Sequence, residues 1–265
     1  MVSCFYYMST EMEEKISGHL NNIEVRHDIK ILLACETGSR AWGFPSPDSD
    51  FDVRLIYMHK KDWYLSLNEK KDTIELMLED NEIDISGWDI RKSLRLLYKS
   101  NPPLLERIQS PIIYRSDPDF LHDINDLANL CYSKIATMHH YLSMSKKILP
   151  EIEDQKKYKL KKFFYALRSS LACRWIIERN EIPPIQFEKM VTELNVESNL
   201  QSRIKELIEL KSGKEEAYFH TGENDLLDFI RLNIDLAENK GLSLPSAKSK
   251  PAQLDVFFIN ILNAK

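Results

Sequence analysis

One segment sets the architecture, and it reads Gly38-Ser39-Arg40-Ala41-Trp42-Gly43-Phe44-Pro45-Ser46-Pro47-Asp48-Ser49-Asp50-Phe51-Asp52-Val53-Arg54-Leu55-Ile56. The apolar run before it, from Ile29 to Cys35, is typical of a buried strand. After Asp50, polar and apolar residues alternate, which predicts a second strand. A Gly-Ser turn therefore lies between two strands, and a pair of aspartates opens the second.

The two aspartates are expected to share one face of this second strand. Alternate side chains of a strand point the same way, so Asp50 and Asp52 lie on one face together with Arg54. Two carboxylates a few ångströms apart repel each other unless a positive charge lies between them. Hard cations such as magnesium prefer carboxylate oxygens combined with nucleotide phosphates. The pattern predicts a metal site more than an acidic turn that caps a strand, because Asp is depleted inside strands.

The turn before the second strand could supply the phosphate half of such a site. Gly38 lets the backbone come close to a ligand, and Ser39 with Arg40 begins a short turn whose N–H groups point outward. The spacing Gly-Ser-x10-Asp-x-Asp resembles the signature of the DNA polymerase beta nucleotidyltransferase superfamily.

Length and composition limit the other classes. A chain of 265 residues suits two domains, and its net charge is −5. No run of 18 consecutive apolar residues and no signal-peptide pattern occurs, so we expect a cytosolic protein without a membrane span. Four scattered cysteines and seven histidines show no ligand spacing. Neither zinc nor disulfides are indicated.

A third carboxylate follows on a later strand. Residues 73–78 and 82–88 alternate as two strands joined by a hairpin turn, and on the second of them Asp84 points away from the apolar face. A helix is expected over residues 11–26, and a short edge strand over Pro111–Arg115. The expected class is α+β, with a small mixed sheet, flanking helices and an all-α C-terminal domain.

The second half of the chain is predicted to be helical. Asn101-Pro102 and Asp117-Pro118 are both good helix starts, and we place the domain boundary near Asp117, giving domains 1–117 and 118–265. The helices are expected at 119–130, 133–149, 156–180, 184–195, 199–212 and 223–240, with a last one over 254–262.

One of these helices carries unusual charge. Residues 146–179 contain ten Lys or Arg and four Asp or Glu, a local charge of +6. An apolar stripe of this helix should be buried, with four side chains on a neighbouring face: Lys157, Lys161, Tyr165 and Arg168. This face suits a nucleotide or RNA, and a solvated charged face explains it equally well.

Five motifs extend the resemblance over most of the chain: Glu36–Gly43, Pro47–Arg54, Ile83–Asp89, Asn101–Glu106 and Tyr165–Trp175. They resemble a family of nucleotidyltransferases in the same superfamily that is associated with RNA repair. In that family a small mixed sheet is followed by an all-helical domain. Thr37 stands where a Ser is expected.

The charges suggest roles for the individual residues. We assign Asp50 and Asp52 to two metal ions, Mg²⁺ or Mn²⁺, and Asp84 to the ion that activates the acceptor hydroxyl. Gly38 and Ser39 would hold the β- and γ-phosphates. Arg40 and Arg54 are candidates to neutralise pyrophosphate, and Arg54 is equally a candidate structural partner of the aspartates. The basic helix adds Lys161 and Arg168 as nucleotide contacts, and Glu36 is a candidate support behind the site.

Three functions follow from these observations. The first is a nucleotidyltransferase that acts on RNA, tRNA or protein, which the three carboxylates favour. The second is a nucleotide-binding regulator or antitoxin-like module that contacts a protein partner. The third is a helical ribonuclease with an Arg-x4-His pair. Arg54 and His59 have that spacing, but they lie on a predicted strand, so we treat this match as chance.

Overall fold

The computed structural model describes residues 9–153, 156–241, 243–245 and 251–264. These residues form two compact units. The first contains the N-terminal residues up to Ala41, Asp50–Tyr132 and the C-terminal helix. The second contains Trp42–Ser49 and the helices that follow Ser133. The chain therefore leaves the first unit between the Gly-Ser turn and Asp50, and then returns to it.

A mixed five-stranded sheet forms the centre of the first unit, in the order β3-β4-β2-β1-β5. Its strands are β1 (Ile29–Glu36), β2 (Phe51–His59), β3 (Thr73–Leu78), β4 (Ile83–Asp89) and β5 (Ile113–Ser116). Only β2 and β4 are parallel neighbours, so the starts of these two strands lie side by side. The turn between β3 and β4 is the 3-10 helix η1 (Glu79–Asn81). The predicted α+β class is confirmed.

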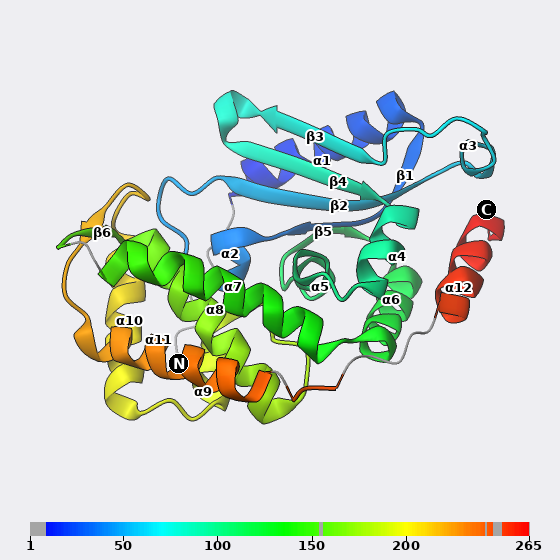
Figure 1. The fold of residues 1–265 in the computed structure, drawn as a ribbon. Coiled ribbons are helices and arrows are strands. Elements are labelled where there is room, and N and C mark those ends of the chain that lie inside the picture. The colour runs from blue at the N-terminus through cyan, green and yellow to red at the C-terminus, as the bar shows by residue number, and fades with distance from the viewer. Residues whose placement is uncertain (1–8, 154–155, 242, 246–250, 265) are drawn as a thin grey trace. The chain divides into compact units, whose positions relative to one another are not determined.

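Helix α1 (Thr10–His27) covers one face of this sheet (Figure 1). Its buried residues recur at helical spacing, and they are Met12, Ile16, Leu20 and Ile23. Each such burial contributes about 1.5–3 kcal/mol to folding. Val53 and Leu55 of β2 belong to the same core. Because side chains alternate along a strand, Asp52 and Arg54 face away from α1.

Three further helices contact strands of the sheet: α4 (Ile90–Tyr98), α5 (Pro102–Ile108) and α6 (Pro118–Cys131). Their N-cap side chains, Asp89, Asn101 and Asp117, each accept a backbone N–H of the first turn, as predicted for the last two. Helices α3 (Lys61–Tyr64) and α12 (Pro251–Asn263) complete the unit. Across the described residues, no helix has the length and apolar character needed to cross a bilayer.

The second unit is a helical bundle. Its helices are α7 (Lys134–Glu153), α8 (Leu160–Arg179), α9 (Phe187–Glu193), α10 (Ser198–Ser212) and α11 (Asn224–Gly241). α8 is at the centre, since α7, α9 and α11 all contact it. The connection Trp42–Ser49 belongs to this core, because Phe44 is fully buried and stacks on Phe164 with 4.7 Å between the ring centroids.

The structure differs from several of the sequence predictions. The helix expected to begin at residue 156 begins at Leu160, and it follows the two-residue strand β6 (Tyr158–Lys159), which pairs with β7 (Phe219–His220). Apart from these two short strands, the second unit is helical, in agreement with the predicted helical C-terminal domain. The Gly-Ser turn is itself a short helix, α2 (Gly38–Trp42). In the compact units α6 and α12 belong with the sheet, since α6 contacts β1 and α12 contacts α4. The domain boundary near Asp117 stays a prediction.

Candidate active site

Gly38 is required where the turn passes the second aspartate. Its φ is +61°, and a Cβ added there would lie 2.0 Å from Asp52 Oδ2. Thr37 fixes the same approach, because its N–H and its hydroxyl both donate to the carbonyl oxygen of Asp52, at 3.0 and 3.3 Å. Any other residue at position 38 would collide with the Asp52 carboxylate. The position of the Gly-Ser turn and the position of the Asp52 carboxylate therefore depend on each other.

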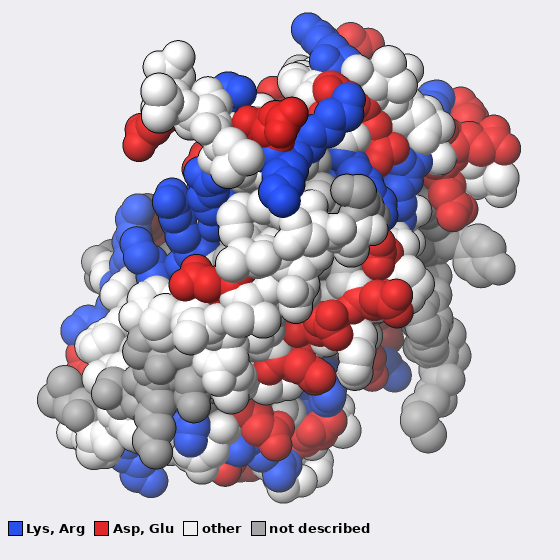
Figure 2. Space-filling model, turned by 90° about the vertical axis from the view of Figure 1, so that its right-hand side faces the viewer, with Lys and Arg blue, Asp and Glu red and all other residues white. Residues whose placement is uncertain are grey.

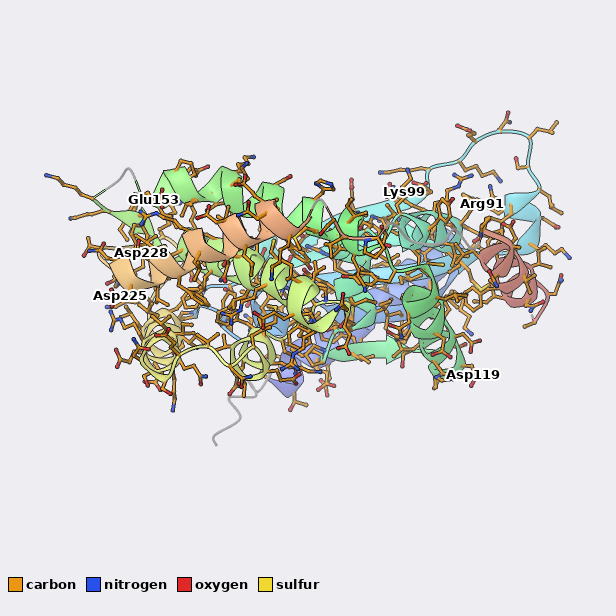
Figure 3. All side chains as sticks on the ribbon, turned by 60° about the horizontal axis from the view of Figure 1, so that its bottom comes forward. Arg91, Lys99, Asp119, Glu153, Asp225 and Asp228 are labelled. Atoms are coloured by element: carbon orange, nitrogen blue, oxygen red, sulfur yellow. The ribbon has the colours of Figure 1, made fainter. Side chains whose placement is uncertain are left out.

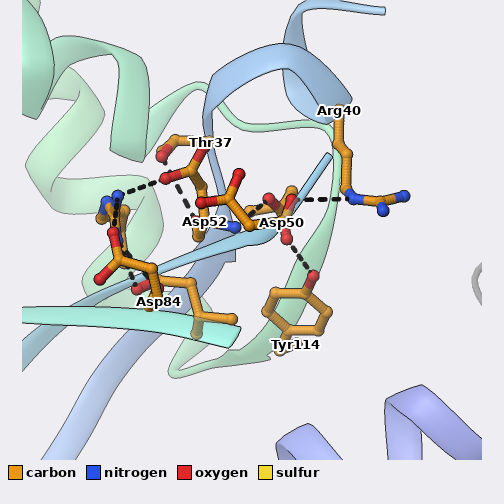
Figure 4. Close-up of polar contacts among 9 residues, drawn as sticks. Thr37, Arg40, Asp50, Asp52, Asp84 and Tyr114 are labelled. Carbon is orange, nitrogen blue, oxygen red and sulfur yellow. Dashed lines mark hydrogen bonds and ion pairs between the residues drawn. The ribbon is translucent and has the colours of Figure 1, made fainter. Parts of the chain in front are cut away.

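Pairing of β2 with β4 brings two of the three predicted carboxylates together. Asp52 and Asp84 are partners in the parallel register, so their side chains leave neighbouring strands at the same level. Both side chains are partly exposed, by 24% and 30%. Asp50 lies just before β2, and Figure 4 shows its carboxylate close to that of Asp52. The structure thus brings Asp50, Asp52 and Asp84 to one site.

Arg54 lies between the two paired aspartates and forms an ion pair with each of them. Its Nη2 donates to Asp52 Oδ1 and, at 2.8 Å, to Asp84 Oδ2. Its Nη1 donates to the Asp84 carbonyl oxygen at 2.9 Å. This guanidinium reduces the repulsion between the two carboxylates. The sequence left two roles open for Arg54, neutralising pyrophosphate or pairing with the aspartates. In the structure Arg54 pairs with the aspartates.

Asp50 differs from Asp52 in its surroundings. No described residue donates a hydrogen bond to its carboxylate or forms an ion pair with it. Its backbone is fixed instead, because Arg40 Nε donates to the Asp50 carbonyl oxygen at 3.1 Å. The Arg40 guanidinium also stacks on Phe51, 3.8 Å from the ring centroid. Arg40 therefore lies beside the site and orients the chain that enters β2.

A buried acid supports Asp52 from behind. Glu36 is fully buried at the end of β1, accepts the Asp52 N–H at 2.7 Å and accepts the hydroxyl of Tyr114. Burial, together with the nearby charge of Asp52, raises the pKa of Glu36 to about 7 against the effect of these hydrogen bonds. Burial also raises the pKa of Tyr114. The sequence suggested Glu36 as a support, but no motif pointed to Tyr114.

The carboxylates fit a divalent metal only in part. Their oxygens are the ligands that Mg²⁺ prefers, and the carboxylate of Asp50 is available beside Asp52. Within the described ranges, however, no group of three or more His, Cys, Asp or Glu residues is arranged to hold an ion. Asp52 and Asp84 are both paired with Arg54. Asp50 therefore fits a metal as it stands, whereas Asp52 and Asp84 would first have to leave Arg54.

The two nucleotide contacts predicted on the basic helix have partners inside the second unit. Lys161 forms an ion pair with Glu216, which also accepts the Ser49 hydroxyl. Arg168 is 4% exposed, and its guanidinium lies over the Trp42 ring at 4.5 Å. The predicted apolar stripe of α8 is buried, as expected. Arg168, by contrast, lies in the core and not on a neighbouring surface. The proposed contacts of both residues with nucleotide stay predictions.

Comparisons with known proteins agree with this site. A family model described as the RNA repair pathway DNA polymerase beta family matches residues 12–260. The uncharacterised protein YcgL of Bacillus subtilis is 40% identical over 224 residues, which cover 84% of this chain and 86% of that protein.

Two solved structures have low overall similarity. A nucleotidyltransferase-like protein from Exiguobacterium sibiricum is 13% identical, with a TM-score of 0.33 and coverage of 86% of this chain and 75% of that one. Spectinomycin adenyltransferase AAD(9) from Enterococcus faecialis, solved with ATP and spectinomycin, is 11% identical, with a TM-score of 0.43 and coverage of 88% and 99%.

The family model defines the class first: the chain is a nucleotidyltransferase of the DNA polymerase beta superfamily. Within that superfamily it belongs to the RNA repair pathway DNA polymerase beta family, whose model covers nearly all of its length.

Proposed function

We propose that this chain transfers a nucleoside monophosphate from a nucleoside triphosphate to a hydroxyl group of RNA, in the cytosol. The observation that supports this most is the position of Asp52, beside Asp84 on parallel strands and against the Gly38 turn. At this position the triphosphate of the nucleotide and the acceptor hydroxyl could bind next to each other. The family description, which names an RNA repair pathway, supports RNA as the acceptor.

The reaction is a displacement at the α-phosphorus. A bond forms between the acceptor oxygen and this phosphorus, the bond from phosphorus to the bridging oxygen breaks, and pyrophosphate leaves with that electron pair. Asp50 and Asp52 would hold divalent metal, which stabilises the attacking and leaving oxygens when bound. The acceptor hydroxyl must lose its proton, and we assign this proton to Asp84. Arg54 then also holds Asp84 in position beside Asp52 until substrate arrives.

The turn is the proposed phosphate contact. The N–H groups at Gly38 and Ser39 would bind the β- and γ-phosphates, with Arg40 beside them. Two features favour this choice. Gly38 has no side chain, so the turn lies directly against the Asp52 carboxylate, and Thr37 holds the turn against β2.

The direct test is a labelling experiment. The purified chain is incubated with each α-labelled nucleoside triphosphate, Mg²⁺, and either total RNA or total protein. We expect label in RNA with the parent chain and none with Asp52→Asn. Label in protein alone would contradict the RNA acceptor. Nucleotide binding without any labelled product would instead favour a regulatory, antitoxin-like module.

A further inference from the structure

Helix α4 carries a stripe of cations in the first unit. Its four basic residues, including the C-cap, are Arg91, Lys92, Arg95 and Lys99. Arg91, Arg95 and Lys99 are each four residues apart, so they lie along one side of the helix. The acid at the start of the helix does not offset them, since Asp89 is fully buried and accepts the Tyr64 hydroxyl.

The two cations of the first turn are held in place by neighbours. Arg91 donates to the Tyr64 carbonyl oxygen at 3.0 Å and lies over the Tyr64 ring. Lys92 is paired with Asp72 at 3.0 Å. The helix dipole disfavours cations in a first turn. The stability of the helix therefore does not explain why Arg91 and Lys92 lie in its first turn.

The two cations of the last turn are available to a ligand. Arg95 and Lys99 are exposed, and no residue in the described part of the chain forms an ion pair with either of them. Figure 3 shows Arg91 and Lys99 on one side of the first unit, with Asp119 at the start of α6 on another side. Four residues of helix, about 6 Å, separate Arg91 from Arg95 and Arg95 from Lys99 along the helix axis.

The segment before β3 extends the stripe. Lys70 and Lys71 are exposed, and Lys70 Nζ lies 5.5 Å from the Trp63 ring. The next residue, Asp72, accepts the Asp89 N–H at its carbonyl oxygen and pairs with Lys92, which joins this segment to the start of α4. Figure 2 shows Lys and Arg side chains, with Asp and Glu among them, over the upper part of one side of the molecule.

We propose that the α4 stripe, defined as Arg91, Lys92, Arg95 and Lys99 with Lys70 and Lys71 beside it, binds the phosphate backbone of the RNA acceptor. Arg91, Arg95 and Lys99 recur every four residues, which matches a strand whose phosphates repeat at regular intervals, and they lie in a chain that is acidic as a whole. This inference rests on the proposed function. From Asp84 to the start of α4 is six residues of strand, about 20 Å. An acceptor must therefore span several nucleotides to touch both.

The test compares two double variants of equal charge. Arg95→Ala/Lys99→Ala removes two cations of the stripe, and Arg26→Ala/Lys205→Ala removes two exposed cations elsewhere. Binding of a labelled single-stranded RNA is measured over a salt series, in an Asp52→Asn background that prevents turnover. We expect roughly tenfold weaker binding at low salt for the stripe variant and a salt slope smaller by about 1.4, that is, 0.7 for each lost phosphate contact. The control variant should bind as the parent does.

A second measurement uses acceptor length. Transfer to a long RNA should fall in the stripe variant, whereas transfer to a dinucleotide acceptor should not change, because a dinucleotide is too short to reach α4. The inference is overturned if the parent does not bind RNA, or if the stripe and control variants behave alike. If the parent chain binds RNA through the stripe but transfers no nucleotide, the proposed function is contradicted and the inference about the stripe is not.

Discussion

Helices α4 and α8 are both rich in Lys and Arg, but their cations have different surroundings. On α8, Lys161 is paired with Glu216 and Arg168 is buried over Trp42. On α4, Arg95 and Lys99 are exposed, and none of the described residues pairs with them. A cation that already has a partner must lose it before it can bind a ligand, whereas an exposed one keeps its charge available. The number of charges along a helix therefore does not identify a binding surface.

The same contrast occurs among the acids of the active site. Asp52 is paired with Arg54 and supported by Glu36, whereas the Asp50 carboxylate has no such contacts among the residues described. Both are proposed to hold metal, so they should be alike in activity and different in stability. This makes the aspartate pair the strongest test of the comparison.

The largest effect is expected for Asp50→Asn and Asp52→Asn. Either variant should lower transfer by more than roughly a hundredfold, because charge that stabilises the transition state is lost. Without metal, Asp50→Asn should unfold at the same temperature as the parent or higher. Asp52→Asn should be less stable by about 1 kcal/mol, since Arg54 loses a partly exposed partner. Thermal unfolding with and without Mg²⁺ measures both.

Near-normal turnover of either variant would show that the metal assignment is wrong. Equal stability of the two variants would break the comparison between partnered and unpartnered acids, while leaving the activity prediction intact.

The second prediction concerns a buried acid whose partners do not offset its burial. The pKa of Glu36 is raised to about 7 from 4.5, so the folded chain binds the proton more tightly than the unfolded chain does. The stabilisation is fully present below pH 4.5 and is lost as the pH rises through 7. Glu36 should therefore lower the free energy of unfolding by up to about 3 kcal/mol between these pH values.

The measurement is chemical denaturation between about pH 5 and 8 for the parent and for Glu36→Gln. The substituted side chain keeps an amide oxygen for the Asp52 N–H but cannot ionise. We expect the variant to lose less stability than the parent as the pH rises. Parallel curves for the two proteins would rule out a raised pKa of Glu36.

The third prediction sets one arginine of α8 against one of α4. Arg168→Ala removes a buried side chain that stacks on Trp42, and it should cost about 2 kcal/mol of stability. Arg95→Ala removes an exposed side chain, and it should change stability by less than about 0.5 kcal/mol. Denaturant unfolding of both variants checks this. Equal losses of stability in the two variants would mean that the different exposure of the two arginines does not determine what they contribute to stability.

Much of the fold could be predicted because local signals agreed with the tertiary structure. Periodicity placed β3 at its observed bounds, and the caps Asn101 and Asp117 marked the starts of α5 and α6. The Gly38 and Asp52 motif was predictable because sterics leave no alternative residue at the turn. Such features depend on residues that are close in sequence or fixed by strand register.

Contacts between distant residues could not be predicted. Tyr114 lies 78 positions from Glu36 and has no motif of its own. The burial of Arg168 depends on Trp42, which the chain contributes to the second unit from the connection before β2. On a helical projection Arg168 looks like a surface cation. Only the packing of the connection Trp42–Ser49 shows that its guanidinium is covered.

The smallest effect is expected for Lys161→Ala, a test of whether a partnered cation on α8 still contributes to function. Lys161 is 36% exposed, and Glu216 keeps the Ser49 hydroxyl as a donor after the change, so the loss of stability should be below about 1 kcal/mol. Because Lys161 is already neutralised by Glu216, nucleotide affinity and its salt slope should change less than RNA affinity changes in Arg95→Ala. Calorimetric titration of the triphosphate over a salt series measures this. A clear loss of nucleotide affinity would mean that Lys161 exchanges Glu216 for phosphate, and the distinction between the two basic helices would then fail at this residue.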